Sequence, residues 1–284
     1  MPFKIPKSEK SSFLVQEDVG NAFYNKLHQH EEIQISCILK GEGTFLIGDG
    51  FGDFNQEDVF VLGNHLPHVF QSDPSSKEVQ MVSVFFTKNS FGSSFFELEE
   101  LQGLSPFFGH IGLGYKLKKS EPSLLQLFSL LKEQDKYGQL ISLLLILKAL
   151  AAEEKEMLSS PVQLRNYEGE EGKRMGDIYS FTLQNYYREI SLKEVSELAN
   201  MTTTSFCRFF KQRTNKSYMH FLTELRLGNV CKLLAKNRNM SIAEIAYRSG
   251  FNNLTHFNRQ FKAAKGLTPT RFRKLTTGKA SAFI

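Results

Sequence analysis

The chain has 284 residues and only three cysteines, Cys37, Cys207 and Cys231, which lie far apart in the sequence. Cysteines so few and so widely spaced exclude a disulfide scaffold and a cysteine-rich zinc module. Long apolar runs are missing as well. The longest extends from Leu140 to Leu147, far short of the ~20 residues that cross a bilayer, and the N-terminal residues contain no apolar stretch of signal-peptide length. The sequence therefore predicts a soluble protein of the reducing cytoplasm that makes no contact with a membrane.

Arginine is absent from the first 164 residues, and ten of the eleven arginines lie from Arg174 onward. Residues 1–172 carry 15 Lys and Arg against 24 Asp and Glu, a net charge of −9, whereas residues 173–284 carry 20 against 6, a net charge of +14. An acidic domain joined to a basic one indicates a polyanionic partner for the basic domain. A composition of 41% hydrophobic and 23% charged residues excludes a chain that is disordered throughout.

The first part of the chain alternates short apolar runs with turn residues. Four runs have the length of strands: Ile33–Leu39, Thr44–Ile47, Val59–Leu62 and Val79–Phe86. Turn residues separate them, as at Gly48-Asp49-Gly50. Fifteen of the 26 phenylalanines precede residue 111, which suits a β-rich core filled by aromatic side chains. We expect a β-sandwich or small β-barrel over residues 1–120.

Helical periodicity replaces this pattern from Ser123. Apolar residues recur at helical spacing in two stretches, residues 124–131 and 140–150. The second stretch is apolar on nearly all sides, so it must be buried on more than one face. Two interpretations remain open: a helix pair at a dimer interface, which we favour, or a helix that covers the barrel within one chain. We expect residues 121–158 to form a helical dimerisation or connector segment, and the polar residues 159–173 to form a linker.

The basic part of the chain contains an internal repeat. Phe206-Cys-Arg-Phe-Phe-Lys211 recurs 51 residues later as Phe257-Asn-Arg-Gln-Phe-Lys262. Each copy is preceded by a Ser-x-x-Glu capping box, at Ser191 and Ser241, which is typical of the start of a helix. The repeat indicates a structural unit of about 50 residues that occurs twice in this part of the chain.

Each copy is expected to contain two short helices joined by a tight turn. The first helix would end at Asn200 or Gly250, residues that tolerate the positive φ of such a turn. The second helix would follow over residues 203–213 or 253–264. Helix, tight turn and helix in a strongly basic unit form the helix-turn-helix arrangement, which places its second helix in the major groove of DNA.

Several further motifs follow in order along this part of the chain. They are Phe221-Leu-Thr-Glu-Leu-Arg-Leu227, Ile242-Ala-Glu-Ile-Ala246, Ser249-Gly-Phe251, Phe257-Asn-Arg-Gln-Phe-Lys262 and Gly266-Leu-Thr-Pro-Thr-Arg-Phe-Arg273. With these motifs, residues 174–274 resemble the DNA-binding domain of the AraC/XylS family of bacterial transcription regulators, in which a long helix links two helix-turn-helix units. Asn200 and Asn215 stand where that family usually has glycine, a mild departure because asparagine also adopts positive φ. The resemblance implies that residues 174–284 form such a domain.

The resemblance also implies which residues read DNA. Base contacts map by motif onto Thr204, Cys207 and Arg208 in the first unit and onto Thr255, Asn258 and Arg259 in the second. Arginine binds guanine through two hydrogen bonds, asparagine reads adenine, and threonine contacts the thymine methyl group. Phosphate contacts are expected from Lys211, Lys262, Arg271 and Arg273. For Arg208 and Arg259 two other roles remain open, a phosphate clamp and an ion pair within the fold.

Polar residues in the first part of the chain resemble the two short motifs of the cupin barrel. They are His28-Gln-His30, Gln34 and Gly41-Glu-Gly43 for the first motif and Pro67-His68 for the second. In metal-bearing cupins, two histidines and an acid of the first motif and a histidine of the second hold the ion. Gln34 occupies the place of the acid and lacks its charge, so we expect neither a metal nor another cofactor, although Glu31 and Glu32 lie nearby. We expect His28, His30, Gln34 and His68 to line an effector pocket; alternatively, they only form hydrogen bonds inside the barrel.

Together these features predict an α+β protein of two domains, a cupin-like β-barrel with a helical dimerisation segment and an all-α domain with two helix-turn-helix units. We expect a sequence-specific, ligand-responsive transcription regulator without enzymatic activity, located at the nucleoid in the bacterial cytoplasm. The expected partners are double-stranded DNA, a small-molecule effector, RNA polymerase and a second copy of the chain bound through residues 121–158. Two alternatives remain, a constitutive DNA-binding regulator with an inert barrel and a metal-dependent cupin enzyme whose basic tail localises it.

Overall fold

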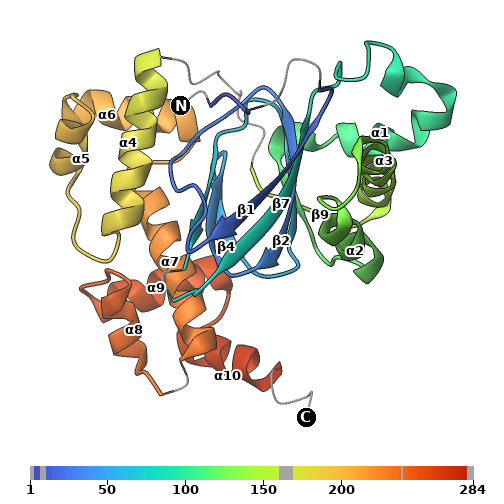
Figure 1. Cartoon of the computed structure of the whole chain (residues 1–284). Helices are drawn as coiled ribbons and strands as arrows, with labels where there is room; N and C mark the ends of the chain where they lie inside the picture. Colours follow the sequence, from blue (N-terminus) through green and yellow to red (C-terminus); the bar gives the residue numbers. More distant parts are fainter. Residues whose placement is uncertain (1–2, 7–10, 74, 160–168, 238, 280–284) are drawn as a thin grey trace. The chain divides into compact units, whose positions relative to one another are not determined.

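The computed structural model describes residues 3–6, 11–73, 75–159, 169–237 and 239–279. The chain divides into two compact units, Met1–Gly176 and Asp177–Ile284. The described residues of the first unit are rich in antiparallel strands, and those of the second are helical (Figure 1). The architecture is α+β, as the sequence predicts.

Two antiparallel sheets build the first unit. The larger has the order β1-β7-β2-β5-β8-β9, with β1 Leu14–Gly20, β2 Ile33–Lys40, β5 Val59–Leu62, β7 Val79–Phe86, β8 Tyr115–Leu117 and β9 Lys155–Met157. The smaller has the order β4-β3-β6, with β3 Gly43–Ile47, β4 Gly50–Phe54 and β6 His68–Ser72. Strands β2, β3, β5 and β7 coincide with the four expected runs, because apolar length and flanking turn residues are local signals.

Strand β5 is buried on both faces and separates two apolar cores. Val59 and Val61 join the core on the side of the helices, whereas Phe60 joins the core between the sheets. This alternation follows from the period of two in a strand. Aromatic rings fill the core between the sheets, where the ring centroid of Phe60 lies 5.2 Å from that of Phe45 and 5.1 Å from that of Phe70.

The segment between β7 and β8 is helical, although it lies within residues 1–120, where we expect a β-sandwich or small β-barrel. It contains the short helices η1 Phe95–Glu97, η2 Glu99–Leu104, α1 Ser105–Phe108 and η3 Ile111–Leu113. Phenylalanines at positions 91, 95, 96, 107 and 108 lie in or beside these helices, and their rings contact one another and Phe86. Phenylalanine content misled the sequence prediction because aromatic side chains fill a core equally well from a helix.

Helices α2 (Pro122–Leu130) and α3 (Lys136–Ala152) follow, as the periodicity predicts. Leu143, Ile146 and Leu147 of α3 are fully buried in the core on the side of the helices. The opposite side of α3 is apolar but exposed, since Ile141 is 43% and Leu145 is 46% exposed. Helix α3 therefore covers the sheet within one chain and still presents an apolar face to solvent.

The connector and linker segments differ in part from expectation. Strand β9 lies within residues 121–158 and pairs with β8, so this segment is not purely helical. A strand of three residues is too short for a recognisable alternation. Of the expected linker, residues 160–168 lie outside the described residues, and residues 169–173 belong to helix α4 (Gly169–Asn185). Glutamates in the first turn of α4 suit a helix start.

The described part of the second unit continues with helices only. They are α5 Leu192–Leu198, α6 Thr203–Thr214, α7 Tyr218–Lys236, α8 Ile242–Arg248, α9 Leu254–Lys265 and α10 Pro269–Lys279. Helices α6 and α9 occupy the expected positions of the second helix in each repeat, and α7 is the expected linking helix. The two helix pairs are therefore α5 with α6 and α8 with α9.

Side-chain caps and left-handed turns shape both helix pairs. The Ser191 and Ser241 hydroxyls each accept a hydrogen bond of 3.1 Å from the backbone N–H three residues later. The turns pass through Asn200 with φ 52° and Gly250 with φ 85°, and Asn215 ends α6 with φ 57°. Asparagine thus adopts the left-handed conformation at both positions where the related family usually has glycine.

Candidate nucleic-acid interface and effector pocket

Helix α6 exposes the residues expected to read DNA in the first helix-turn-helix unit. Its buried face consists of Phe206, Phe209, Phe210 and Thr214. Its exposed face carries Thr204, Cys207, Arg208 and Lys211. The periodicity of the helix separates these two sets, so all four candidates remain accessible to a ligand.

Helix α9 repeats this arrangement in the second unit. Phe257 and Phe261 are fully buried against α7 and α8. The exposed face carries Thr255, Asn258, Arg259 and Lys262. Within the described part of the chain, neither Arg208 nor Arg259 forms an ion pair or a hydrogen bond. Their guanidinium groups are therefore available for DNA, and an ion pair within the fold, left open by the sequence, is disfavoured.

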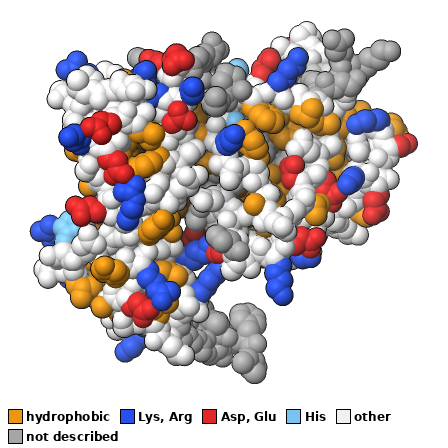
Figure 2. All heavy atoms as spheres, turned by 60° about the vertical axis from the view of Figure 1, so that its left-hand side comes forward, with side chains coloured by type: hydrophobic (Ala, Val, Ile, Leu, Met, Phe, Trp, Pro, Cys, Tyr) orange, Lys and Arg blue, Asp and Glu red, His pale blue; other side chains and the backbone are white. Residues whose placement is uncertain are grey.

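The two arginines of α10 differ in exposure. Arg271 is exposed, whereas Arg273 is half-buried with its Nε and Nη2 atoms inaccessible to solvent. Arg271 therefore fits a phosphate contact better than Arg273 does. On the face shown in Figure 2, basic and acidic side chains are interspersed. On that face, charge alone does not outline an interface, and the exposed faces of α6 and α9 remain the candidate DNA-reading surfaces.

Arg226 of the linking helix α7 lies beside both helix-turn-helix units. Its guanidinium donates to the backbone oxygen of Tyr186 at 2.8 Å and to that of Arg188 at 2.6 Å, both in the segment before α5. It also lies beside the turn of the second unit, where a Cβ added to Gly250 would lie 2.6 Å from Arg226 Nε. Sequence reasoning missed Arg226, because its sequence neighbours do not distinguish it from the other basic residues of α7.

Replacing Arg226 with methionine should loosen the spacing between the two recognition helices, because two partly buried carbonyl groups lose their donor. We expect binding to a single DNA block to change less than about threefold, while discrimination against sites with one base pair inserted between the blocks falls about tenfold. Mobility-shift titrations on the two site lengths measure this. Lys193→Met, at an exposed position of α5, is the control; equal spacing discrimination in Arg226→Met would contradict the role of Arg226.

The four residues expected in the effector pocket lie together in the first unit. His28 and His68 form an isolated backbone bridge, with hydrogen bonds of 3.1 and 2.8 Å between their main chains. Their ring centroids are 4.3 Å apart, and the ring of His30 lies 5.1 Å from that of His68. His30 Nε2 lies 3.0 Å from Gln34 Oε1. The structure therefore brings residues from three segments to one point inside the sheets.

Gln34 is anchored by a buried hydrogen-bond network. Its amide nitrogen donates to Ser36 Oγ at 2.8 Å, and Ser36 Oγ lies 2.7 Å from Ser83 Oγ. All three side chains are buried. A buried network of this kind limits the movement of its members, so the Gln34 amide is held beside His30.

Burial keeps the three imidazoles uncharged. Desolvation lowers the pKa of His28 to about 4 and lowers the pKa of His30, while hydrogen bonds at both rings oppose the effect. Desolvation also lowers the pKa of His68 well below its usual value, and the neighbouring histidines act in the same direction. Neutral imidazoles bind uncharged polar groups or metal ions rather than attract an anion by charge.

The cavity beside these histidines is small. It has a volume of about 60 Å³ and is lined by Phe3, Ile5, Gln16, Asp18, Phe23, Tyr24, His28, Gln34, His68, Phe70, Met81 and Phe85. Phe3 covers it, with its ring centroid 5.4 Å from that of Tyr24 and 5.2 Å from that of His28. Burial raises the pKa of the Asp18 carboxyl in the same wall. Sequence reasoning missed Phe3 and Asp18, because neither belongs to a motif.

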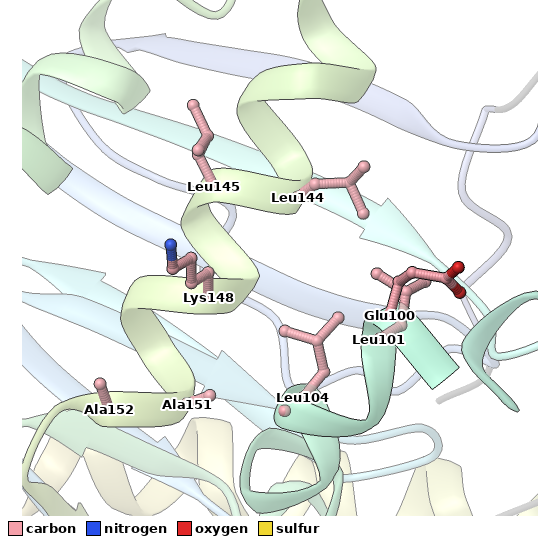
Figure 3. A pocket seen from close by; sticks show the side chains of 9 residues that line it. Glu100, Leu101, Leu104, Leu144, Leu145, Lys148, Ala151 and Ala152 are labelled. Carbon is pink, nitrogen blue, oxygen red and sulfur yellow. The ribbon is translucent and has the colours of Figure 1, made fainter. Parts of the chain in front are cut away.

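A larger apolar pocket of about 550 Å³ lies beside helix α3. It is lined by Glu100, Leu101, Gly103, Leu104, Leu144, Leu145, Lys148, Ala151 and Ala152. Figure 3 shows side chains of α3 and of the short helix η2 facing this pocket, with Lys148 and Glu100 as its labelled charged residues. We call this pocket, together with the exposed Ile141 of the same helix, the α3 face.

Comparison with known proteins finds two matching family models. Residues 13–150 match the AraC-like ligand binding domain, and residues 195–275 match a helix-turn-helix domain. The Bacillus subtilis protein named uncharacterized HTH-type transcriptional regulator YdeC is 22% identical over 260 residues, which cover 89% of this chain and 88% of that protein. The Streptococcus mutans Msm operon regulatory protein is 23% identical and covers 84% and 83%. The HTH-type transcriptional activator RhaR of Mannheimia succiniciproducens is 22% identical and covers 87% and 86%.

No helix in the described ranges is long and apolar enough to span a membrane. The two family models match the two structural units in the order that the sequence predicts. The similar proteins are named as transcription regulators, and the matches cover most of their length. The chain therefore belongs to the AraC family of DNA-binding transcription regulators, with an AraC-like ligand-binding domain followed by a helix-turn-helix domain.

Proposed function

We propose that this regulator reads two short DNA blocks with helices α6 and α9. The observation that carries the proposal is the exposure of Thr204, Cys207 and Arg208 on one helix and of Thr255, Asn258 and Arg259 on the other, above buried phenylalanines. Lys211, Lys262 and Arg271 flank these positions and would neutralise phosphates. Two such helices on one linking helix enter successive major grooves about 34 Å apart.

We further propose that the barrel binds a small-molecule effector at His28, His30, Gln34 and His68. Converging polar groups in an apolar cavity support this role. Because the cavity of about 60 Å³ holds no more than one or two waters, Phe3 and Ile5 must move to admit an effector. A ligand that binds the open arrangement better shifts its population, and DNA affinity changes by that differential binding.

The same small cavity favours one alternative, a constitutive regulator whose barrel binds nothing. Thermal-shift screening of the full-length chain against metabolites, followed by DNA-binding titration with each hit, separates the two. A hit that changes DNA affinity supports the sensor. Binding that changes neither DNA affinity nor transcription supports the constitutive alternative.

Replacing His28 with phenylalanine should abolish the thermal shift caused by any effector found in that screen. The aromatic ring keeps the apolar packing against Phe3 and Tyr24 but removes both nitrogen atoms. Basal DNA affinity should stay within about twofold, because His28 lies outside the DNA-binding unit. His110→Phe, at an exposed position of the same unit, is the matched control; an unchanged effector response in His28→Phe would place the effector elsewhere.

We propose that the chain works as a homodimer joined through the α3 face, within the segment 121–158 expected from the sequence. Exposed apolar side chains such as Ile141 and Leu145 beside an apolar pocket support this role, because exposed apolar surface often marks an interaction site. RNA polymerase is the further partner expected of a transcription regulator, and the bacterial cytoplasm is the expected location.

A further inference from the structure

Three imidazole rings converge inside the barrel in the manner of a ligand set. One ring nitrogen from each of His28, His30 and His68 lies within 4.8 Å of the others. Backbone structure positions the rings without a ligand, since His28 and His68 pair through their main chains and His30 precedes β2. The convergence therefore comes from the fold.

The hydrogen bonds of the three imidazole rings determine which ring nitrogen of each histidine can bind a ligand. His28 Nδ1 lies 2.9 Å from Lys26 O, His30 Nδ1 lies 3.0 Å from Glu32 O, and His68 Nδ1 lies 2.8 Å from Leu66 O. A carbonyl oxygen only accepts, so each Nδ1 carries the proton and donates it. In an uncharged ring, Nε2 then presents its lone pair. This orientation of histidine by a backbone carbonyl is the usual outer support of a metal ligand.

The Nε2 atoms of this set have unmet bonding capacity. His68 is 1% exposed, and its Nε2 is buried with no hydrogen-bond partner among the described residues. A buried acceptor without a donor destabilises the fold, because the group has lost its hydrogen bonds to water and gained none in exchange. His30 Nε2 faces Gln34 Oε1 at 3.0 Å, so two lone pairs meet unless the amide is turned or a cation lies beside them.

We propose that the Nε2 atoms of His28, His30 and His68 bind one divalent transition-metal ion, with Zn²⁺ as the probe. Three neutral nitrogen donors without a carboxylate suit zinc, cobalt or nickel and not magnesium or calcium. With Zn–N bonds of ~2.0–2.1 Å, tetrahedral ligands lie ~3.3 Å apart, so nitrogens that now lie up to 4.8 Å apart must approach by up to about 1.5 Å through side-chain rotation. A fourth position stays open toward the cavity, where the Gln34 oxygen or a small molecule completes the coordination.

This site departs from the expectation that Gln34 prevents metal binding. That expectation compared Gln34 with an acid and considered charge alone. The geometry adds three oriented lone pairs, one of them without a partner, which a cation would satisfy. The metal site rests on the pocket proposed for an effector. It is tested by metal binding in the absence of DNA, so its failure can be distinguished from failure of the DNA-binding function.

The test uses untagged full-length protein stripped with a chelator and then dialysed against Zn²⁺ or Co²⁺. We expect one ion per chain by elemental analysis, the visible absorption of four-coordinate Co²⁺, and a rise in the melting temperature of the first unit. His28→Gln and His68→Gln should each weaken binding about 100-fold. His65→Asn, next to the site with its φ of 57° suited to asparagine, should bind as the original chain does.

Circular dichroism of each variant shows whether weaker metal binding comes from a missing ligand or from an unfolded chain. If one of the two variants does not fold, the other still tests the site. The proposal is overturned if the original chain binds no stoichiometric metal tighter than about 10 µM. It is also overturned if folded His28→Gln and His68→Gln bind as tightly as His65→Asn. Metal binding that leaves DNA affinity unchanged would keep the site and remove the ion as an effector, whereas sequence-specific DNA binding by a chain that binds no metal would keep the regulator and remove the site.

Discussion

Leu145→Glu is expected to convert the protein to a monomer and to weaken its binding to a two-half-site operator by about 100- to 10,000-fold, because linked binding of two chains is lost. Leu145 is 46% exposed on α3 and lines the pocket of the α3 face. A carboxylate there would be desolvated in a dimer without a partner, at a cost of several kcal/mol. In the monomer the same carboxylate would stay hydrated, so the fold of one chain should be retained.

Sedimentation velocity and mobility-shift titration on one-half-site and two-half-site DNA measure this prediction. Affinity for one half-site should stay within about threefold, since each chain keeps its own helix-turn-helix units. Lys118→Glu introduces the same side chain at an exposed position of the first unit and should leave both measurements unchanged. A Leu145→Glu protein that sediments as a dimer would show that the α3 face is not the interface.

Arg259→Ala is expected to relax base preference in one DNA block by about 1–3 kcal/mol, or roughly 5- to 150-fold at one position. Arg259 is exposed on α9 and is not engaged by another described residue. Loss of a bidentate contact to guanine penalises the preferred base and leaves the other bases nearly unaffected. The second block, read by α6, should keep its preference.

Lys262→Ala is the matched comparison, because Lys262 is exposed on the same helix one turn further along. It should weaken all sequences alike and reduce the slope of log affinity against log salt by about one unit. Binding-site selection and salt titration on both variants give the two readouts. Identical behaviour of Arg259→Ala and Lys262→Ala would remove the distinction between base reading and phosphate contact.

The helix-turn-helix domain was predictable because its determinants are local. A serine cap, a residue with positive φ and a phenylalanine repeat together specify each helix pair within about 25 residues. Asn200 and Asn215 adopt the left-handed conformation that the turns need. Local signals also placed β2, β3, β5 and β7, whose apolar runs are bounded by turn residues.

Features that depend on distant pairing were not predictable. Strand β9 returns to the sheet edge after helix α3, and Phe3 reaches the cavity from outside every motif. The convergence of His28 and His68 depends on a backbone bridge across 40 positions, and the direction of their Nε2 atoms depends on carbonyl groups of neighbouring loops. The motif spacing identified these histidines, but only the folded structure shows which of their ring nitrogens converge.

Binding-site selection with the whole chain tests whether α6 and α9 read separate DNA blocks. Random duplexes enriched by the protein are sequenced, and the base preference at each position is compared between the original chain and Arg208→Ala or Arg259→Ala. We expect two short preferred blocks about 10 base pairs apart for each chain, with each variant relaxing a different block. A single continuous block, or enrichment that is unchanged in both variants, would contradict it.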